Sequence, residues 1–528
     1  MANKDILLIE PGYKNKYPPL GLMKLAAYHG PYGKKDNVKF IKGDKDRSVL
    51  GVNWDRIYIT TLFSFEWKEI TKAIDSAINI AKGDTTKVFV GGIAASLMHE
   101  RFLAEPRWRG VRFISGLLSA APAIALQLDD FAEELYSTDT TGTPIEDLVP
   151  DYSIIDQIRD QYVYPVNDAY FAYASRGCIR KCHFCGVPKL EGEQRDAQSI
   201  TALITAIDER HGKKRDLMLM DNNVVASPNY RSIIAEIRDN GFERGAMFKR
   251  PGRPATQRRV DFNQGVDARI LCKDKMYLQE MATIAIKPLR IAFDHLGVRK
   301  GYETAIRMAH EVGLHDLSNY MLYNFKDTPS DLYERMRINI DLNESLNIRI
   351  FSFPMRYQPT DLPDRSYSGD HWNRYYLRSM QIILQATHGI VSGAPDFFRR
   401  AFGKDKEEFE SLLLRPQHYL FNRFWYEDYE GHAEFTEFKS EFNRLSETDR
   451  QELAALLSET TPSGFAGLVG KADSSKVNRI LSYYVPIPKD EEAEIWKVMK
   501  QRLQESKKVG TEIPEDELVE DAGLAEVA

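Results

Sequence analysis

The stretch RGCIRKCHFCG, residues 176–186, holds three of the four cysteines of this 528-residue chain. Cys178, Cys182 and Cys185 follow the pattern C-x3-C-x2-C. Thiolate is the soft ligand that iron–sulfur clusters take, so three thiolates on one short loop can bind three irons of a cubane cluster. The fourth iron would then have no protein ligand, and it could bind a chelating substrate or cofactor.

A zinc site is the alternative, because His183 and the three cysteines make four nominal ligands. However, His183 lies between Cys182 and Cys185, which is awkward for one tetrahedral centre, and no second C-x-x-C follows. The remaining cysteine, Cys272, follows an apolar pair and is expected to be an inert buried thiol, with a role as hydrogen-atom donor as the alternative. Such cysteine usage excludes a secreted disulfide framework.

The cysteines follow the first of six strand candidates, which alternate with helical patterns. Strands alternating with helices favour a parallel arrangement, here a partial (β/α)6 barrel of the TIM type, in which chemistry occurs at the carboxyl ends of the strands. The candidates span residues 169–175, 216–220, 260–263, 289–294, 319–323 and 348–353.

Polar residues follow the later strand candidates and are therefore candidate ligand-binding residues. Each group also has an ordinary interpretation. The residues after the second strand could form a turn, those after the third could be a solvated strand end with an internal Asp267–Arg269 pair, and the others could only line a cavity. The groups are Asp221-Asn222-Asn223 after the second strand, Asn263-Gln264-Gly265 with Asp267 and Arg269 after the third, Asp294-His295 after the fourth, Tyr323-Asn324 after the fifth, and Pro354 with Arg356 after the sixth.

Residues 1–120 also alternate short apolar runs with helical patterns, which predicts a Rossmann-like parallel sheet. Ligands of such sheets bind at the carboxyl ends of the strands, which here lead into residues 10–21, 60–65 and 91–92. The runs span residues 6–9, 38–41, 56–60, 88–92 and 111–114.

The predicted domain organisation follows from these patterns. We expect a Rossmann-like domain over 1–135, a linker over 136–165, the barrel over 166–360, a helical domain over 361–507 and an acidic disordered tail over 508–528. The last 18 residues hold seven acids and no base, so the rest of the chain carries a net charge of about +1 instead of −6. No apolar stretch approaches the roughly 18–20 residues of a membrane span, and the N-terminus lacks a signal-peptide pattern. We therefore expect a cytoplasmic protein without a membrane partner.

Two further stretches bear on partners. Residues 244–259 hold six bases and no acid; they could contact a phosphate-bearing substrate or nucleic acid, and a solvated basic loop is the alternative. The aromatic run at residues 419–429 could stack on bases, but aromatic density in a helical domain is typical of a core.

The cysteine motif, with Phe184 as the aromatic residue before the last cysteine, resembles the signature of radical S-adenosylmethionine (SAM) enzymes. The stretch YPPLGL at 17–22 and the glycine pair at 91–92 resemble the B12-binding domain of B12-type radical SAM proteins. Residues 260–357 resemble a bacterial and phage radical SAM subgroup without an assigned reaction. The resemblance covers roughly residues 1–360.

This resemblance implies a 4Fe-4S cluster on the three cysteines, with SAM chelated to the open iron. Reductive cleavage of SAM would give a 5′-deoxyadenosyl radical, with the electron supplied by an external reductant of the flavodoxin or ferredoxin type. It also places SAM-binding residues after the barrel strands, and the substrate would be a small molecule or nucleotide-like. The implied cofactor-binding residues are Asp221, Asn222, Asn223, Gln264, Arg269, Asp294 and Tyr323; no catalytic residue is implied.

Cobalamin is left open. The common base-off site uses D-x-H-x-x-G, and the loop at 10–21 contains no histidine, whereas the pattern at Asp46, Ser48 and Gly51 carries serine in its place. The domain could bind cobalamin without this ligand, which would fit a cobalamin-dependent methyltransferase, or serve packing or the substrate. The alternative function is a non-catalytic module, stabilised by zinc or an Fe–S cluster, that binds nucleic acid through residues 244–259 and the helical domain.

Overall fold

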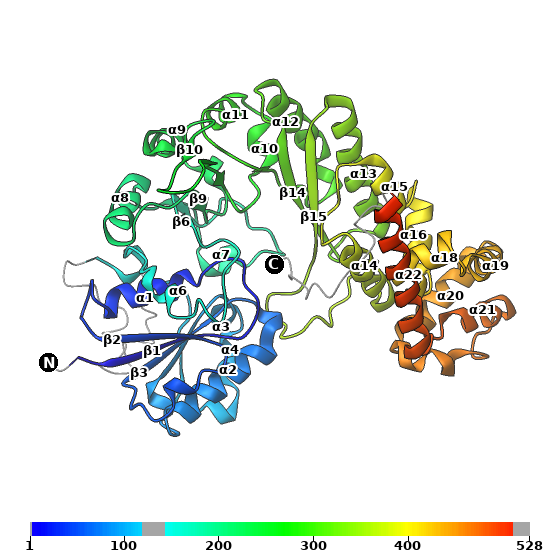
Figure 1. The fold of residues 1–528 in the computed structure, drawn as a ribbon, viewed down its shortest axis with the longest axis horizontal. Helices are drawn as coiled ribbons and strands as arrows, with labels where there is room; N and C mark the ends of the chain where they lie inside the picture. The colour runs from blue at the N-terminus through cyan, green and yellow to red at the C-terminus, as the bar shows by residue number, and fades with distance from the viewer. Residues whose placement is uncertain (1–2, 119–142, 510–528) are drawn as a thin grey trace. The chain divides into compact units, whose positions relative to one another are not determined.

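The computed structural model describes residues 3–118 and 143–509 (Figure 1). The predicted mixed α/β class is confirmed. The predicted tail from residue 510 onward, and residues 119–142 of the predicted first domain and linker, lie outside the described residues. The chain forms two compact units: Met1–Ala292 with Thr304–Asp316 and Gln358–Tyr367, and Phe293–Glu303 with Leu317–Tyr357 and Ser368–Ala528.

The N-terminal part of the first unit is a parallel five-stranded sheet in the order β2-β1-β3-β4-β5. Each strand falls on one of the five apolar runs, which confirms those predictions. Continuous apolar runs form these strands because helices cover both faces of a parallel sheet. The strands are β1 (Asp5–Glu10), β2 (Asn37–Lys42), β3 (Arg56–Thr61), β4 (Val88–Gly92) and β5 (Arg112–Phe113).

The helices of this sheet pack through apolar stripes. In α2 (Trp67–Ile80), the buried residues Ile70, Ala73, Ile74 and Ala77 recur at spacings of three and four, as the helical period requires. The other helices are α1 (Leu20–His29), α3 (Ile93–Leu97) and α4 (His99–Leu103).

The strand order reverses between β1 and β3. In open parallel sheets the crevice beyond the carboxyl ends of the strands at such a switch point is the usual ligand site. Glu10 ends β1 and Thr61 ends β3, so the fold directs attention to the loops that follow these two residues.

A second parallel sheet, in the order β12-β9-β6, follows in the same unit. Its strands fall on the first three barrel-strand candidates and are shorter than predicted: β6 (Ala169–Ala172), β9 (Asp216–Leu219) and β12 (Val260–Asp261). Two antiparallel pairs accompany it, β7 (Ser175–Arg176) with β8 (Arg195–Asp196) and β10 (Met247–Phe248) with β11 (Thr256–Gln257). The remaining elements are α6 (Ser153–Asp156), α7 (Val187–Leu190), α8 (Ile200–His211), α9 (Tyr230–Ile237), α10 (Ala268–Leu271), α11 (Met276–Met281) and β13 (Leu289–Arg290).

In the second unit, β14 (Asp316–Tyr323) and β15 (Arg349–Arg356) are hydrogen-bonded neighbours. Between them runs α13 (Pro329–Leu346), which begins with a capping box of Thr328 and Asp331 and ends at Asn347 in the left-handed conformation. Helix α12 spans Arg299–Glu311, and its residues from Thr304 onward are assigned to the first unit.

The rest of the second unit is helical, as predicted. The aromatic run contributes Tyr419 and Tyr426 to a buried core with Phe435 and Phe438, which confirms its interpretation as core. The helices are α14 (Arg374–Ala386), α15 (Pro395–Phe402), α16 (Lys406–Leu414), α17 (Gln417–Phe421), α18 (Arg423–Asp428), α19 (His432–Phe442), α20 (Glu447–Ser458), α21 (Ser475–Ile480) and α22 (Lys489–Val509). No helix within the described residues is long and apolar enough to cross a membrane.

Candidate functional site

The three clustered cysteines lie on a loop, residues 177–194, that the short β7–β8 pair closes. We call it the cysteine loop. The amide of Cys178 donates to the carbonyl of Gly192 at 3.3 Å, which joins the two ends of the loop. Gly177 has φ +75°, and a Cβ there would lie 2.2 Å from the carbonyl oxygen of Glu193. Glycine is therefore required at this position for steric and conformational reasons.

The donor chemistry of the cysteine loop suits an iron–sulfur cluster. The cysteines are partly buried, and backbone amides donate to two of the sulfurs: Arg180 N to Cys178 Sγ and Val187 N to Cys185 Sγ, both at 3.4 Å. Such N–H···S bonds tune the reduction potential of Fe–S clusters. Within residues 3–118 and 143–509, no three His, Cys, Asp or Glu side chains lie close enough together to hold a metal ion. The side-chain positions therefore do not distinguish an iron–sulfur cluster from zinc.

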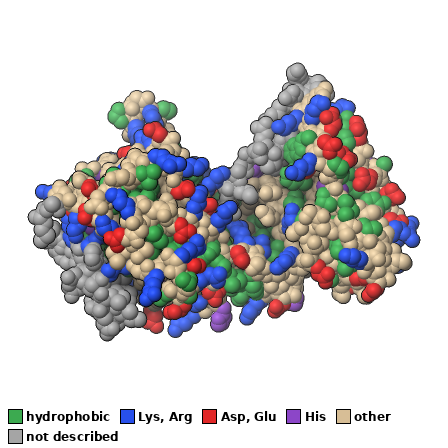
Figure 2. All heavy atoms as spheres, turned by 90° about the horizontal axis from the view of Figure 1, so that it is seen from below, with side chains coloured by type: hydrophobic (Ala, Val, Ile, Leu, Met, Phe, Trp, Pro, Cys, Tyr) green, Lys and Arg blue, Asp and Glu red, His purple; other side chains and the backbone are tan. Residues whose placement is uncertain are grey.

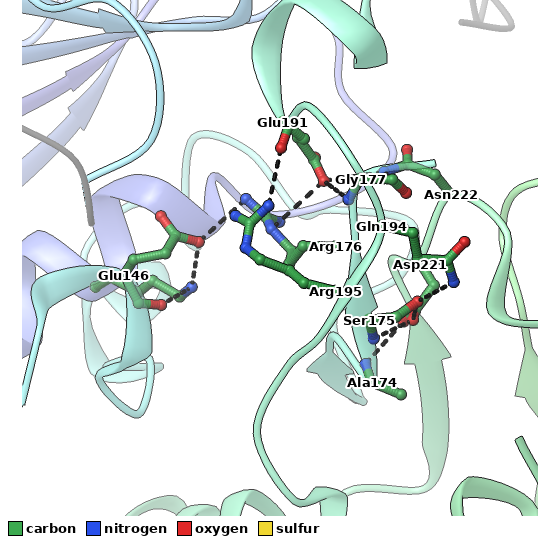
Figure 3. Close-up of polar contacts among 11 residues, drawn as sticks. Glu146, Ala174, Ser175, Arg176, Gly177, Glu191, Gln194, Arg195, Asp221 and Asn222 are labelled. Atoms are coloured by element: carbon green, nitrogen blue, oxygen red, sulfur yellow. Dashed lines mark hydrogen bonds and ion pairs between the residues drawn. The ribbon is translucent and has the colours of Figure 1, made fainter. Parts of the chain in front are cut away.

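A buried network of charged side chains holds the two ends of the cysteine loop together (Figure 3). We call these two ends the foot of the loop and the network the brace. Glu191 accepts from the amide of Gly177 at 2.8 Å and from Asn222 Nδ2 at 3.0 Å. Its carboxylate also lies 3.5 Å from Arg176 Nε. Because this carboxylate contacts the start of the loop and the end of β9 together, it fixes one against the other.

Arg176 extends this brace to the N-terminal sheet. Its guanidinium stacks on Tyr173, 3.8 Å from the ring centroid, and lies 3.2 Å from Glu146. Glu146 in turn pairs with Lys24 of α1 at 2.9 Å. Burial raises the pKa of Glu146, but Lys24 and Arg176 outweigh it and the net pKa is lowered. The four charged side chains therefore form a neutral buried network, in which each charge has an opposite partner.

Asp221, predicted to bind a cofactor, is 2% exposed and has its carboxylate engaged within the protein. It accepts from the amides of Ala174 and Ser175 and from the hydroxyl of Ser175 (Figure 3). Burial raises its pKa to about 6 despite these hydrogen bonds. Asp221 therefore holds the chain just before the cysteine loop, and direct cofactor binding by this residue stays a prediction.

The two residues that follow also join the loop to its surroundings. Asn222 donates to Glu191, and Asn223, which is 4% exposed, accepts from the amide of Asp267 at 3.3 Å. Gln194 donates to the hydroxyl of Ser175 and the carbonyl of Asn223. The ends of β6, β9 and β12 are thus connected by side chains at their carboxyl edge.

Asp267, after β12, bridges two arginines. It accepts from Arg180 of the cysteine loop at 2.7 Å and from Arg269 at 2.7 and 3.1 Å. Burial opposes the charged form, but the bonds from Arg269 and Arg180 lower the pKa of Asp267 overall. The predicted Asp267–Arg269 pair is present, while the side chain of Gln264 is exposed. Arg269 therefore reaches a ligand only if it shares its guanidinium with Asp267.

Asn263 connects the same strand end to the N-terminal sheet. Its Oδ1 accepts from the hydroxyl of Tyr17 at 2.7 Å, and Tyr17 belongs to the loop after β1. The loops after β1 and β12 therefore meet.

Asp294 and Tyr323 belong to the second unit, where one buried arginine holds the backbone near both. Nη1 of Arg335 donates to the carbonyls of Asp294 and Leu322, each at 2.8 Å, and Nη2 pairs with Asp327 at 2.8 Å. Tyr323 is 3% exposed and packs on Trp372. The other five predicted cofactor residues belong to the first unit and follow β9 and β12.

Sequence reasoning missed three residues that shape the site, namely Arg176, Glu191 and Arg335. A signal existed only for Arg176, which borders the motif. Glu191 lies in a polar segment without periodicity, and Arg335 lies in a helix where arginine usually indicates a solvated face.

The basic stretch forms the β10–β11 hairpin and its flanks, and half of its bases bind protein groups. Arg250 pairs with Asp168 at 2.6 Å, Arg244 donates to the carbonyl of Gly313, and Arg258 stacks on Phe242. On the face shown in Figure 2, basic and acidic side chains are interspersed. These contacts leave fewer bases for a polyanion than the sequence suggests.

The carboxyl end of β1 holds a second buried polar cluster. Glu10, fully buried, pairs with Lys42 at 2.7 Å and accepts from Tyr164 and Asn15. Burial raises the pKa of Glu10 although Lys42 and the hydrogen bonds oppose this. These side chains include no imidazole, so the cluster offers cobalt no axial histidine.

The serine variant of the D-x-H-x-x-G pattern is a local turn. Asp46 accepts from the amide of Ser48 at 2.9 Å and so caps a short 3-10 helix. This contact accounts for Asp46 without a cofactor.

No protein-family model matches the chain, and no curated protein matches its sequence. Among solved structures, the radical S-adenosylmethionine methyltransferase TsrM from Kitasatospora setae, with cobalamin and a 4Fe-4S cluster bound, has a TM-score of 0.45 and 14% identity, covering 68% of this chain and 77% of its own. SuiB of Streptococcus suis, bound to the precursor peptide SuiA, has a TM-score of 0.29 and 13% identity, covering 42% and 46%. At this distance, function must be argued from the residues of this chain.

Proposed function

We propose that this chain is a radical SAM enzyme. The observation that carries the proposal is the cysteine loop: three cysteines in C-x3-C-x2-C spacing, directly after β6, with backbone amides donating to two of the sulfurs. Cys178, Cys182 and Cys185 would hold a 4Fe-4S cluster through three of its irons. When bound together, the cluster and SAM supply a one-electron cleavage that gives methionine and a 5′-deoxyadenosyl radical.

The protein's own part is to hold the loop and the cofactor in place. Glu191 and Asp221 fix the foot of the loop through its amides. We propose that Asn222, Asn223, Gln264, Arg269, Asp294 and Tyr323 contact SAM, with Asp221 supporting the set. The partial (β/α)6 barrel of the six strand candidates belongs to the same proposal.

Ligand assignment is tested with two cysteine variants. Under oxygen-free reconstitution, the wild-type chain should bind about four irons and release 5′-deoxyadenosine with SAM and a reductant. Cys182→Ala should lose the cluster and this activity. Cys272→Ala should keep both, because Cys272 lies outside the motif and its Sγ contacts the carbonyl of Arg269 at 3.7 Å. Iron and acid-labile sulfide analysis gives the readout.

A wild-type chain that binds one zinc and no sulfide would contradict the proposal. That result would favour the non-catalytic metal-stabilised module instead. An iron-loaded Cys182→Ala protein would overturn the ligand assignment alone.

A cobalamin-dependent methyltransferase is the finer form of the proposal. Its support is the strand order of the N-terminal sheet, which reverses between β1 and β3; open parallel sheets usually bind ligands beyond the strand ends at such a point. Cobalamin bound there would have no histidine below the cobalt, because residues 10–21 contain none. We further propose a cytoplasmic location, where thiols stay reduced, and an external one-electron reductant.

A further inference from the structure

The exposed side of the cysteine loop differs from its braced foot. Ile179 is 51% exposed although it is apolar. Lys181, His183 and Lys189 are also exposed, as is Arg195 in the strand that closes the loop. A single exposed apolar side chain is ordinary by itself; the bases around Ile179 and their position beside the cysteines distinguish this surface.

The charge on this surface is positive and available. Within the described residues, neither Lys181 nor Lys189 forms an ion pair, and Arg195 donates only to the backbone carbonyl of Glu191. Arg180 is not available, because Asp267 pairs with it at 2.7 Å. Of the two acids in the loop, Glu191 is part of the brace and Glu193 is exposed. Lys181 and Lys189 thus have no acidic partner in the described part of the chain, and Glu193 is the one acid of the loop outside the brace.

This surface lies directly at the predicted cluster ligands. Ile179 follows Cys178, and Lys181 and His183 flank Cys182, so each is one Cα step of about 3.8 Å from a ligand. A partner that contacts these residues therefore approaches the cluster itself. Electron-transfer encounters bury small areas, roughly under 1,200 Å², so a surface of one loop is large enough.

We propose that the exposed side of the cysteine loop is the docking surface for an acidic electron-carrier protein with a low-potential flavin or iron–sulfur centre. The inference rests on the proposed function. Lys181, Lys189 and Arg195 steer the acidic carrier, and Ile179 supplies the apolar contact. In the encounter the carrier is oxidised by one electron and the cluster is reduced by one; no bond forms or breaks.

The test compares two double charge reversals of equal size. Lys181→Glu/Lys189→Glu changes the proposed surface. Lys82→Glu/Lys213→Glu is the control, because both lysines are exposed and lie in turns that precede β4 and β9, at the opposite ends of these strands from the loops described above. All three reconstituted proteins are mixed with reduced flavodoxin, and the loss of the cluster's visible absorbance is followed by stopped flow. Binding of oxidised flavodoxin is measured in parallel.

At low ionic strength we expect the loop variant to be reduced by flavodoxin at least about tenfold more slowly than the wild type, with weaker binding and the difference shrinking as salt is added. The control should match the wild type. With reduced methyl viologen, a small cation, the loop variant should react as fast as the wild type or faster. This opposite sign distinguishes steering from damage to the cluster.

Equal flavodoxin rates in all three cluster-containing proteins would overturn this inference and leave the proposed function standing. A loop variant that is slow with both reductants would also overturn it. A wild-type chain that takes up no iron would overturn both proposals.

Discussion

Asp221 is a buried carboxylate whose charge is costly, although three donors from Ala174 and Ser175 face it. Burial raises its pKa from the ordinary value of 3.8 to about 6. Between these two values the folded chain retains a proton that the unfolded chain has lost. The stability that the chain gains from holding this proton on Asp221 is therefore complete below pH 3.8 and is lost as pH rises through about 6.

We expect Asp221→Asn to remove this pH dependence. As pH rises from about 4 to 7, the free energy of unfolding of the wild type should fall relative to that of the variant by up to about 3 kcal/mol. The asparagine also points an N–H toward a backbone donor, which adds a constant destabilisation. Denaturant titrations of both proteins across this pH range give the measurement; a difference that does not vary with pH would contradict the assigned pKa.

At the residue level, types and spacing predicted the cysteine loop but not its supports. The motif needs three thiols close in sequence, so it is visible without a structure. Glu191 acts on Gly177, fourteen residues earlier, and Tyr17 acts on Asn263, 246 residues later. Neither pair has a periodic pattern, because such contacts depend on how strand ends are placed side by side.

Among the elements, the cysteine loop depends on the glycine at its entrance. Gly177 and Gly192 have nearly equal positive φ values, +75° and +74°, yet a Cβ at Gly177 would meet the carbonyl of Glu193 at 2.2 Å, whereas at Gly192 it meets nothing within 4 Å. Substitution by alanine thus imposes the same backbone strain at both, roughly 1–2 kcal/mol, but a steric clash only at Gly177.

We therefore expect Gly177→Ala to lower iron uptake at least about tenfold while Gly192→Ala stays near the wild type. Limited proteolysis should show faster cleavage within residues 177–194 in the first variant only. Iron retention by both variants to the same extent would show that the entrance to the loop tolerates the displaced backbone.

The strands of the N-terminal sheet were predictable because they are continuous apolar runs between polar turns. β6, β9 and β12 fall on predicted candidates but are shorter, since polar residues such as Asp221 and Asn263 end regular pairing. The brace could not be predicted, and neither could the contacts that the hairpin's bases make with protein groups. The sequence does not show whether a charged residue is bound by another protein group or by water.

For the whole molecule, one prediction concerns cobalamin at the N-terminal sheet. If the finer proposal holds, the chain should retain hydroxocobalamin through gel filtration, and the Co(II) form should show no nitrogen coupling from a lower ligand in its electron paramagnetic resonance spectrum. Denatured chain, as a control, should elute without the corrinoid. Failure of the native chain to retain it would assign the sheet to packing or to the substrate, and nitrogen coupling would reveal a ligand outside residues 10–21.

The chain of contacts from Lys24 through Glu146 to Arg176 has a practical consequence for dissecting this protein. An expression fragment that starts at residue 166 would lack the first two of these side chains, and Arg176 would keep Glu191 as its one carboxylate partner in the chain of contacts. A truncated cysteine-bearing piece would thus keep the Arg176–Glu191 pair but lose the contacts that fix Arg176 to helix α1. Iron binding measured on such a fragment would therefore be lower than that of the intact chain.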